Sequence, residues 1–197
     1  MEAEPPSFLA GRERVREAFA CASEAHEGQE RKGDGSPYIN HPVELARLLV
    51  EAGEDDEDLL AAALLHDTVE DTEMTLAQIR ERFGDRVHAI VAAMTEHKDV
   101  EPYEARKDDH RDMIERAGEA TAKIYAADKL ANLRDMRSLY AAVGEGAAGR
   151  FNAPLDVRFR LWRRDLEMVE TVVPGFELNA PLRAELDAFE AERAATT

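Results

Sequence analysis

The feature that most constrains the fold is a helical spacing of apolar residues along nearly the whole chain. It is clear in three stretches: NHPVELARLLVEAG, LDVRFRLWRRDLEMVETVV and APLRAELDAFEAERAA. Apolar residues three or four positions apart lie on one face of an α-helix. Alternating runs rich in Val, Ile and Thr, which are typical of strands, are absent from the sequence. The sequence therefore predicts an all-α fold.

Capping and breaking residues divide this pattern into segments. Asn40 is placed to cap a helix that ends at Gly53, and Thr75 to cap one that ends at Gly84. An acidic run at residues 54–58 starts the helix between them, which we expect to continue through LLAAALLHD. The other expected helices cover about residues 9–27, 85–98, 103–116, 120–143, 155–173 and 180–195.

The length favours one domain. A chain of 197 residues can bury one substantial core, and we find no internal repeat or convincing linker. We predict a single HD-type domain over residues 1–197, with a motif core at about 7–137 and C-terminal helices at about 150–197. The stretch GEGAAG, Gly144 to Gly149, matches the dinucleotide pattern G-x-G-x-x-G, but it follows a helix and not a strand, so we interpret it as a turn.

Charge and cysteine content exclude several classes of protein. The formal net charge of −17 repels nucleic acid and anionic membranes, so we expect neither as a partner. A single cysteine, Cys21, cannot form an intramolecular disulfide or a thiolate metal site. No apolar run approaches the roughly 18 residues that span a bilayer, and we see no signal peptide. The sequence therefore predicts a cytoplasmic protein.

The apolar run LLAAALL is followed at once by four polar side chains, His66, Asp67, Glu70 and Asp71. A helix that only filled a core would keep its buried face apolar, so this cluster suggests a bound cation. His66 and Asp67 would lie about 100° apart around a helix, and both can reach one ion. Glu70 and Asp71 follow them by four residues and can lie beside that ion as proton-transfer groups.

Two further residues can complete such a site. His41 stands beside Pro42, where the backbone is rigid. Asp128 shares a helical stripe with Ile124 and Ala127, and a carboxylate there is costly unless a cation or hydrogen bonds compensate it. Two imidazoles and two carboxylates suit Mn²⁺, Fe²⁺, Zn²⁺ or Co²⁺. Water on such an ion is acidic enough to attack a phosphate at neutral pH.

Plainer interpretations remain open from spacing alone. The pair HD occurs by chance in many chains, and a helical histidine is more often a hydrogen-bonded residue than a ligand. The acids can equally form a solvated face in so acidic a protein. We assign structural roles to the four other histidines, His26, His88, His97 and His110.

Three segments together resemble a known family: RKGDGSPYINHP, LLHDTVEDT and KIYAADKLANLRDM. They are similar to the signatures of the HD-domain hydrolases of the RelA/SpoT class, which remove the 3′-pyrophosphate of the alarmones ppGpp and pppGpp. The likeness is closest to the stand-alone small alarmone hydrolases, including the metazoan SpoT homologues. It covers roughly residues 7–137 in order, and the chain then ends at residue 197, so we expect no alarmone synthesis.

The resemblance implies a role for each matching residue. It implies that Glu70 and Asp71 activate water or handle protons, and that Asn132 lies beside the site among the substrate-binding residues. In this family the ion is usually Mn²⁺. The metal ligands implied are His41, His66, Asp67 and Asp128.

The resemblance also implies a nucleotide-binding segment at Arg31 and Lys32. Ala131 stands where relatives often carry a larger aromatic residue or His, which would open that side of the pocket. A basic funnel for the small anionic nucleotide is expected from other residues of the motif segments, namely Lys123, Lys129 and Arg134.

The function expected is metal-dependent hydrolysis of the 3′-pyrophosphate of ppGpp or pppGpp, giving GDP or GTP and pyrophosphate. Two alternatives stay open. One is an HD phosphohydrolase for another nucleotide such as NADPH, and the other is a catalytically silent alarmone-binding module. The complete ligand set with Glu70, Asp71 and Asn132 counts against the silent module, because a sensor needs no hydrolytic centre.

Overall fold

The computed structural model describes residues 6–31, 35–150 and 153–196. Within these ranges the regular structure is helical, apart from an isolated bridge between Glu30 and Pro37, so the all-α prediction is confirmed. No helix of the described residues is long and apolar enough to cross a membrane. The elements are η1 (Ser7–Leu9), α1 (Glu13–Ala25), α2 (Asn40–Glu51), α3 (Glu57–Leu65), α4 (Thr68–Asp71), α5 (Leu76–Met94), α6 (Tyr103–Ala117), α7 (Glu119–Val143), η2 (Gly144–Arg150), α8 (Leu155–Val172) and α9 (Asn179–Thr196).

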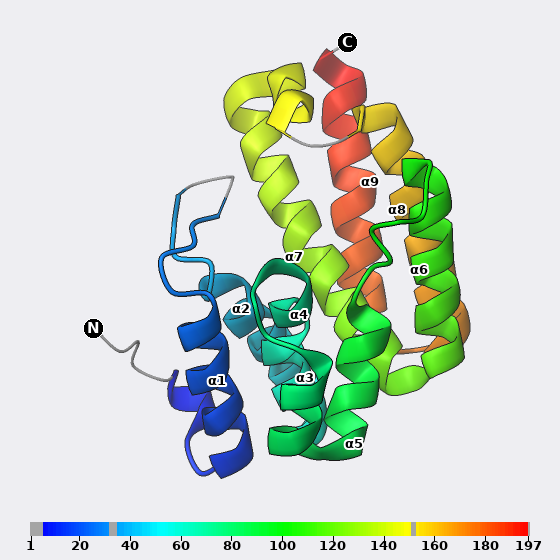
Figure 1. Ribbon diagram of the computed structural model, residues 1–197. Coiled ribbons are helices and arrows are strands. Elements are labelled where there is room, and N and C mark those ends of the chain that lie inside the picture. Colours follow the sequence, from blue (N-terminus) through cyan, green and yellow to red (C-terminus); the bar gives the residue numbers. More distant parts are fainter. Residues whose placement is uncertain (1–5, 32–34, 151–152, 197) are drawn as a thin grey trace.

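The long helix α7 connects two groups of helices (Figure 1). On one side it packs against α2, α3 and α5, and on the other against α6, α8 and α9. Helix α3 lies between α1, α2 and α5, and all seven of its residues from Leu59 to Leu65 are buried. Neighbours on several sides explain why α3 is apolar all round and not amphipathic.

Two of the predicted helix boundaries are confirmed in atomic detail. Thr75 caps α5, its side chain accepting a hydrogen bond from the backbone N–H of Gln78 while the Gln78 side chain returns to the Thr75 backbone. Gly84 divides α5 into two helical parts, because its φ of 82° and ψ of 179° are open essentially to glycine alone. GEGAAG forms the short helix η2 directly after α7, as expected of a turn and not of a dinucleotide loop.

Other boundary predictions are wrong. Asn40 lies inside α2, whose N-cap is Ile39, and no side chain caps that end. Helix α1 begins at Glu13 and not near residue 9, because Gly11 at φ 80° separates it from η1. The expected continuous helix through LLHDTVED is broken after Leu65 and resumes only as the short α4. This last difference shapes the functional site.

Candidate metal centre and active site

The break between α3 and α4 is stabilised by side chains that bind the last carbonyls of α3. His66 Nδ1 lies 2.9 Å from the Ala63 carbonyl oxygen, and Thr68 Oγ1 donates to the Leu65 carbonyl at 2.8 Å. These contacts satisfy backbone acceptors that a helix end leaves open. The contact with Ala63 turns the Nε2 side of the His66 ring toward Asp67 and Asp128.

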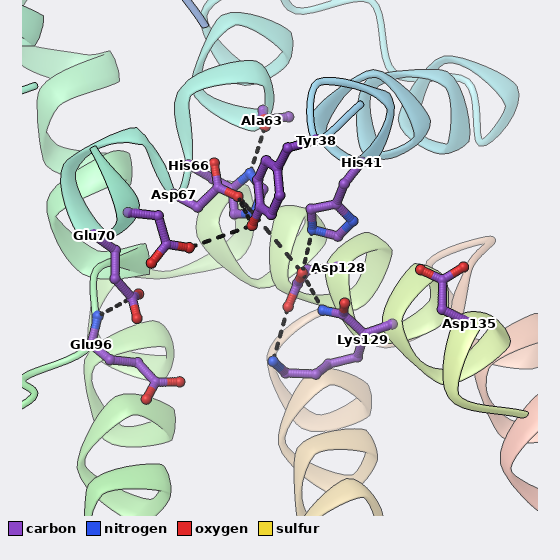
Figure 2. Close-up of polar contacts among 12 residues, drawn as sticks. Tyr38, His41, Ala63, His66, Asp67, Glu70, Glu96, Asp128, Lys129 and Asp135 are labelled. Carbon is purple, nitrogen blue, oxygen red and sulfur yellow. Dashed lines mark hydrogen bonds and ion pairs between the residues drawn. The ribbon is translucent and has the colours of Figure 1, made fainter. Parts of the chain in front are cut away.

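Three buried side chains from three helices converge at one point (Figure 2). His41 comes from α2, His66 from the end of α3 and Asp128 from α7, and one ligand atom of each lies within 4.8 Å of the others. The Asp128 Oδ1 atom is 3.1 Å from His41 Nε2 and 3.9 Å from His66 Nε2. Three of the four predicted ligands are therefore brought together.

Asp67 lies beside this group with both of its oxygens engaged. Its Oδ1 is 3.2 Å from His26 Nε2, and its Oδ2 accepts a hydrogen bond from the Tyr38 hydroxyl at 2.7 Å. His66 Nε2 is 3.6 Å from the same Oδ2. Burial would raise the pKa of Asp67, but His66, His26 and Tyr38 together hold it below its usual range. His26 thus orients a site residue, beyond the purely structural role that the sequence suggested.

Neighbouring side chains compensate the negative charge of the buried Asp128 carboxylate. Its Oδ2 accepts from Lys129 Nζ at 2.9 Å, and its Oδ1 accepts from Asn132 Nδ2 at 2.6 Å. Burial would raise the pKa of Asp128, but Lys129, His41 and His66 lower it well below its usual range. The carboxylate is therefore an anion, as a metal ligand must be.

The donor set fits a divalent cation. His66 Nε2 faces two carboxylate oxygens, of Asp67 and Asp128, at 3.6 and 3.9 Å, too far for hydrogen bonds. Two anionic oxygens directed at one point repel each other unless positive charge lies between them, and a divalent cation supplies that charge. His41 Nδ1 is buried and has no hydrogen-bond partner among the described residues. Nitrogen and oxygen donors without thiolate suit Mn²⁺, Fe²⁺, Co²⁺ or a catalytic Zn²⁺.

These candidate ligands line a cavity of about 180 Å³ that both predicted catalytic acids also line. Burial, and then the neighbouring Glu96 carboxylate, raise the pKa of Glu70. Asp71 Oδ2 is 3.5 Å from the Tyr38 hydroxyl, and Lys98 Nζ is 3.6 Å from a carboxylate oxygen of each acid. Glu70 and Asp71 therefore lie in the same pocket as the candidate ligands.

A second cavity of about 260 Å³ adjoins the first, and His41 lines both. Its wall carries Arg31, which is paired with Asp135, and Arg134, whose Nη1 is 3.8 Å from Glu44 Oε1. Ala131 also lines this cavity, in agreement with the expectation of open space there.

The remaining predicted basic residues divide between the site and other regions. Lys129 and Asn132 line the smaller cavity, where both contact Asp128. Lys123 lines neither cavity and is paired with Glu54 at 2.6 Å, so its expected place in the funnel is wrong. Lys32 lies outside the described residues.

Sequence reasoning missed five residues of the smaller cavity, of which Met94 is apolar and the other four are polar. Tyr38 lies within the recognised segment PYINHP, so its position was visible but its contact with Asp67 was not. Glu96 lies in the loop after α5, and Lys107 and His110 lie on α6, where no motif distinguishes them. Lys107 is paired with Glu96, and His110 Nδ1 is 3.5 Å from the same carboxylate.

Comparisons with known proteins give a consistent result. The model of the HD domain family matches residues 18–148. The guanosine-3′,5′-bis(diphosphate) 3′-pyrophosphohydrolase MESH1 of Mus musculus is 44% identical over 125 residues, 61% of this chain and 68% of that protein. The guanosine-3′,5′-bis(diphosphate) 3′-pyrophosphohydrolase of Aquifex aeolicus is 37% identical over 126 residues, 63% of this chain but only 18% of that longer protein.

Solved structures extend the likeness to the C-terminal helices. The structure of a metazoan ortholog of SpoT, described as hydrolysing ppGpp and playing a role in starvation responses, superposes with a TM-score of 0.71 at 30% identity. That match covers 97% of this chain and 98% of the other. A protein from Listeria monocytogenes matches with a TM-score of 0.66 at 31% identity over 76% of this chain and 99% of that one.

Proposed function

Because the chain belongs to the HD domain family, we propose that it is a metal-dependent phosphohydrolase that removes the 3′-pyrophosphate of ppGpp or pppGpp. The observation that carries this proposal is the convergence of His41, His66 and Asp128 in one buried group, beside a cavity that also holds Glu70 and Asp71. A relative named for this reaction matches 61% of the chain, and a solved structure described as hydrolysing ppGpp matches 97% of it.

The metal would be Mn²⁺, held by His41, His66 and Asp128 with Asp67 as the fourth ligand. Asp67 already lies against His66, and its contacts with His26 and Tyr38 would orient it. When bound, such an ion supplies a Lewis acid for the phosphoryl group and lowers the pKa of water.

Glu70 and Asp71 would move protons. Burial raises the pKa of Glu70 toward neutral pH, and a group whose pKa lies nearer the working pH is a better general acid or base. The Tyr38 hydroxyl lies 2.7 Å from Asp67 and 3.5 Å from Asp71, so it links the metal-binding wall to the acidic pair. We assign proton transfer from the attacking water to this pair, and protonation of the departing ribose 3′-oxygen to the same residues.

Arg31 and Arg134 would bind the anionic substrate in the larger cavity. Both guanidinium groups line that space, and each has a carboxylate partner that phosphate oxygens would replace or share. Asn132 would contact the substrate from the smaller cavity, which it lines and where it hydrogen-bonds Asp128.

The proposal is tested by product analysis. Purified protein with Mn²⁺ is offered ppGpp, pppGpp and NADPH in parallel, and the products are separated. Pyrophosphate with GDP or GTP is the expected result. Orthophosphate from NADPH alone would overturn the substrate assignment, and ppGpp binding without turnover would favour a silent alarmone-binding module.

A further inference from the structure

Lys129 occupies an unusual place for a residue expected to bind substrate. Its side chain is only 14% exposed, and its ammonium lies between the Asp128 carboxylate at 2.9 Å and the Tyr125 ring, 4.2 Å from the ring centroid. An ammonium loses strong hydration when it is buried, so it stays buried only where an anion and a polarisable face compensate that loss. Both compensating groups are already in contact with Lys129.

The Tyr125 ring that Lys129 contacts is held in place by a residue of helix α8. Tyr125 is 1% exposed, and its hydroxyl donates to Asp165 Oδ1 of α8 at 2.9 Å. Arg111 Nη1 of α6 donates to the same oxygen at 2.7 Å, and the Arg111 side chain is 7% exposed. The edge of His110 meets the Tyr125 ring with centroids 5.5 Å apart. Burying such an ionic pair is expensive, and nothing in the proposed reaction uses it.

The two oxygens of Asp128 make different contacts. Oδ1 accepts from Asn132 and faces the Nε2 atoms of both histidines, whereas Oδ2 accepts from Lys129. The terminal torsion of an aspartate is broad, so the backbone alone does not decide which oxygen faces the imidazoles. Hydrogen bonds from neighbouring groups make that choice in metal sites, and their loss typically weakens metal binding about 10–100-fold.

We propose that Lys129 is a positioning residue that fixes the Asp128 carboxylate toward the two histidines, and that Asp165 supports it through Tyr125. The chain of contacts runs from α8 through α7 to the metal ligand. Asp165 lies beyond residues 18–148, the part of the chain that matches the HD domain model, so the metal centre depends on a helix outside that match. This inference rests on the metal centre of the proposed function, but it removes Lys129 from the residues that contact substrate.

The test is Mn²⁺ titration of the full-length protein without substrate, read by calorimetry, on the wild type and Lys129→Met. Methionine keeps an unbranched apolar stem over Tyr125 but lacks the ammonium. We expect the Mn²⁺ dissociation constant to rise about 10–100-fold. Turnover of ppGpp should then return at saturating Mn²⁺ with KM unchanged, and Lys129→Arg, which keeps a charged donor, should recover most of the affinity.

A matched control is available on the same helix. Lys123 is also paired with a carboxylate, Glu54 at 2.6 Å, and also lies over an aromatic ring, Phe176 at 5.6 Å from its centroid. Lys123→Met therefore makes the same change of charge and shape away from both cavities. It should leave the Mn²⁺ dissociation constant unchanged.

The contribution of α8 is tested with Tyr125→Phe, which keeps the ring and removes only the hydroxyl that reaches Asp165. We expect Mn²⁺ affinity to fall several-fold, whether or not the melting temperature also falls. An unchanged affinity would refute the support from Asp165.

The outcomes separate this inference from the proposed function. If the wild type binds no Mn²⁺, the metal centre itself is wrong. If the wild type binds Mn²⁺ and Lys129→Met binds it equally well while its KM for ppGpp rises, the positioning role is wrong and Lys129 contacts substrate.

Discussion

Replacing Asp128 with asparagine removes a charge from the centre of the site while nearly keeping its shape. Without metal, the substitution deprives Lys129 of its only close anion among the described residues, at 2.9 Å, and both side chains are largely buried, 10% and 14% exposed. Breaking a buried ion pair costs about 3–5 kcal/mol. The retained amide oxygen and the Tyr125 ring favour the lower end, about 3 kcal/mol.

This free energy converts into a melting shift. A protein of this size loses about 2–4 °C per kcal/mol, so the variant in chelator should melt about 6–12 °C below the wild type. Mn²⁺ at 100 times its dissociation constant stabilises the wild type by about 2.7 kcal/mol, a rise of about 5–11 °C. If the variant binds about 100-fold more weakly, the same Mn²⁺ adds only about 0.4 kcal/mol, or about 1–2 °C.

The assay is thermal unfolding followed by circular dichroism, with Mn²⁺ and with chelator, on the wild type and on Asp128→Asn. Asp112→Asn on α6 is the control, because the Asp112 side chain is 63% exposed and is paired with the also exposed Arg116 at 3.5 Å. Asp112→Asn should keep the full metal-dependent rise. If Asp128→Asn keeps it as well, Asp128 is not a ligand. If Asp128→Asn and the wild type have the same melting temperature in chelator, the buried ion pair contributes little to stability.

Four further substitutions or pairs of substitutions test the site and the fold. Glu70→Gln and Asp71→Asn should retain Mn²⁺ by elemental analysis yet lose about 10²–10⁴-fold in kcat; loss of the metal would instead make either residue part of the coordination shell. Glu96→Gln removes a negative neighbour that raises the pKa of Glu70. The acidic limb of the pH–rate profile, where Glu70 becomes protonated as pH falls, should therefore move to lower pH. A limb that does not move would show that Glu70 does not set it. Arg31→Ala should raise KM for ppGpp with little change in kcat, and the reverse pattern would exclude a ground-state binding role. Gly84→Ala, at φ 82°, should lower the free energy of unfolding by about 1–3 kcal/mol in urea denaturation, whereas unchanged stability would mean that the kink relaxes.

Local signals predicted the parts of the structure that local chemistry decides. Thr75 followed by Gln78 three residues later is a complete helix start, and the φ of Gly84 explains why the sequence pattern stops there. Asp128 was visible because a carboxylate in an apolar stripe requires compensation. The structure supplies that compensation with Lys129, Asn132 and His41.

The break after Leu65 could not be read from the sequence. LLHDTVED contains no glycine or proline, so its helical pattern continues through the residues where the backbone leaves the helix. The break depends on His66 and Thr68 turning back to the α3 carbonyls, and the packed neighbours of α3 hold that arrangement. Propensity is a weak guide where tertiary contacts decide.

Contacts between residues distant in the sequence could not be predicted either. Tyr125 and Asp165 are 40 positions apart, and each alone looks like an ordinary residue of an amphipathic helix. The contact of His26 with Asp67 spans 41 positions and joins α3 and α4 to the end of α1. Such pairs are seen only when the helices are packed, which is why the sequence indicated candidate ligands but not the residues that contact them.

We propose one divalent ion held by His41, His66, Asp67 and Asp128. Anomalous-difference density from crystals of the protein grown with Mn²⁺ tests it most directly. We expect a single strong peak bonded to the Nε2 atoms of His41 and His66 and to oxygens of the two aspartates. A peak bound instead by Glu70 and Asp71, or no peak near the two histidines at saturating Mn²⁺, would contradict it.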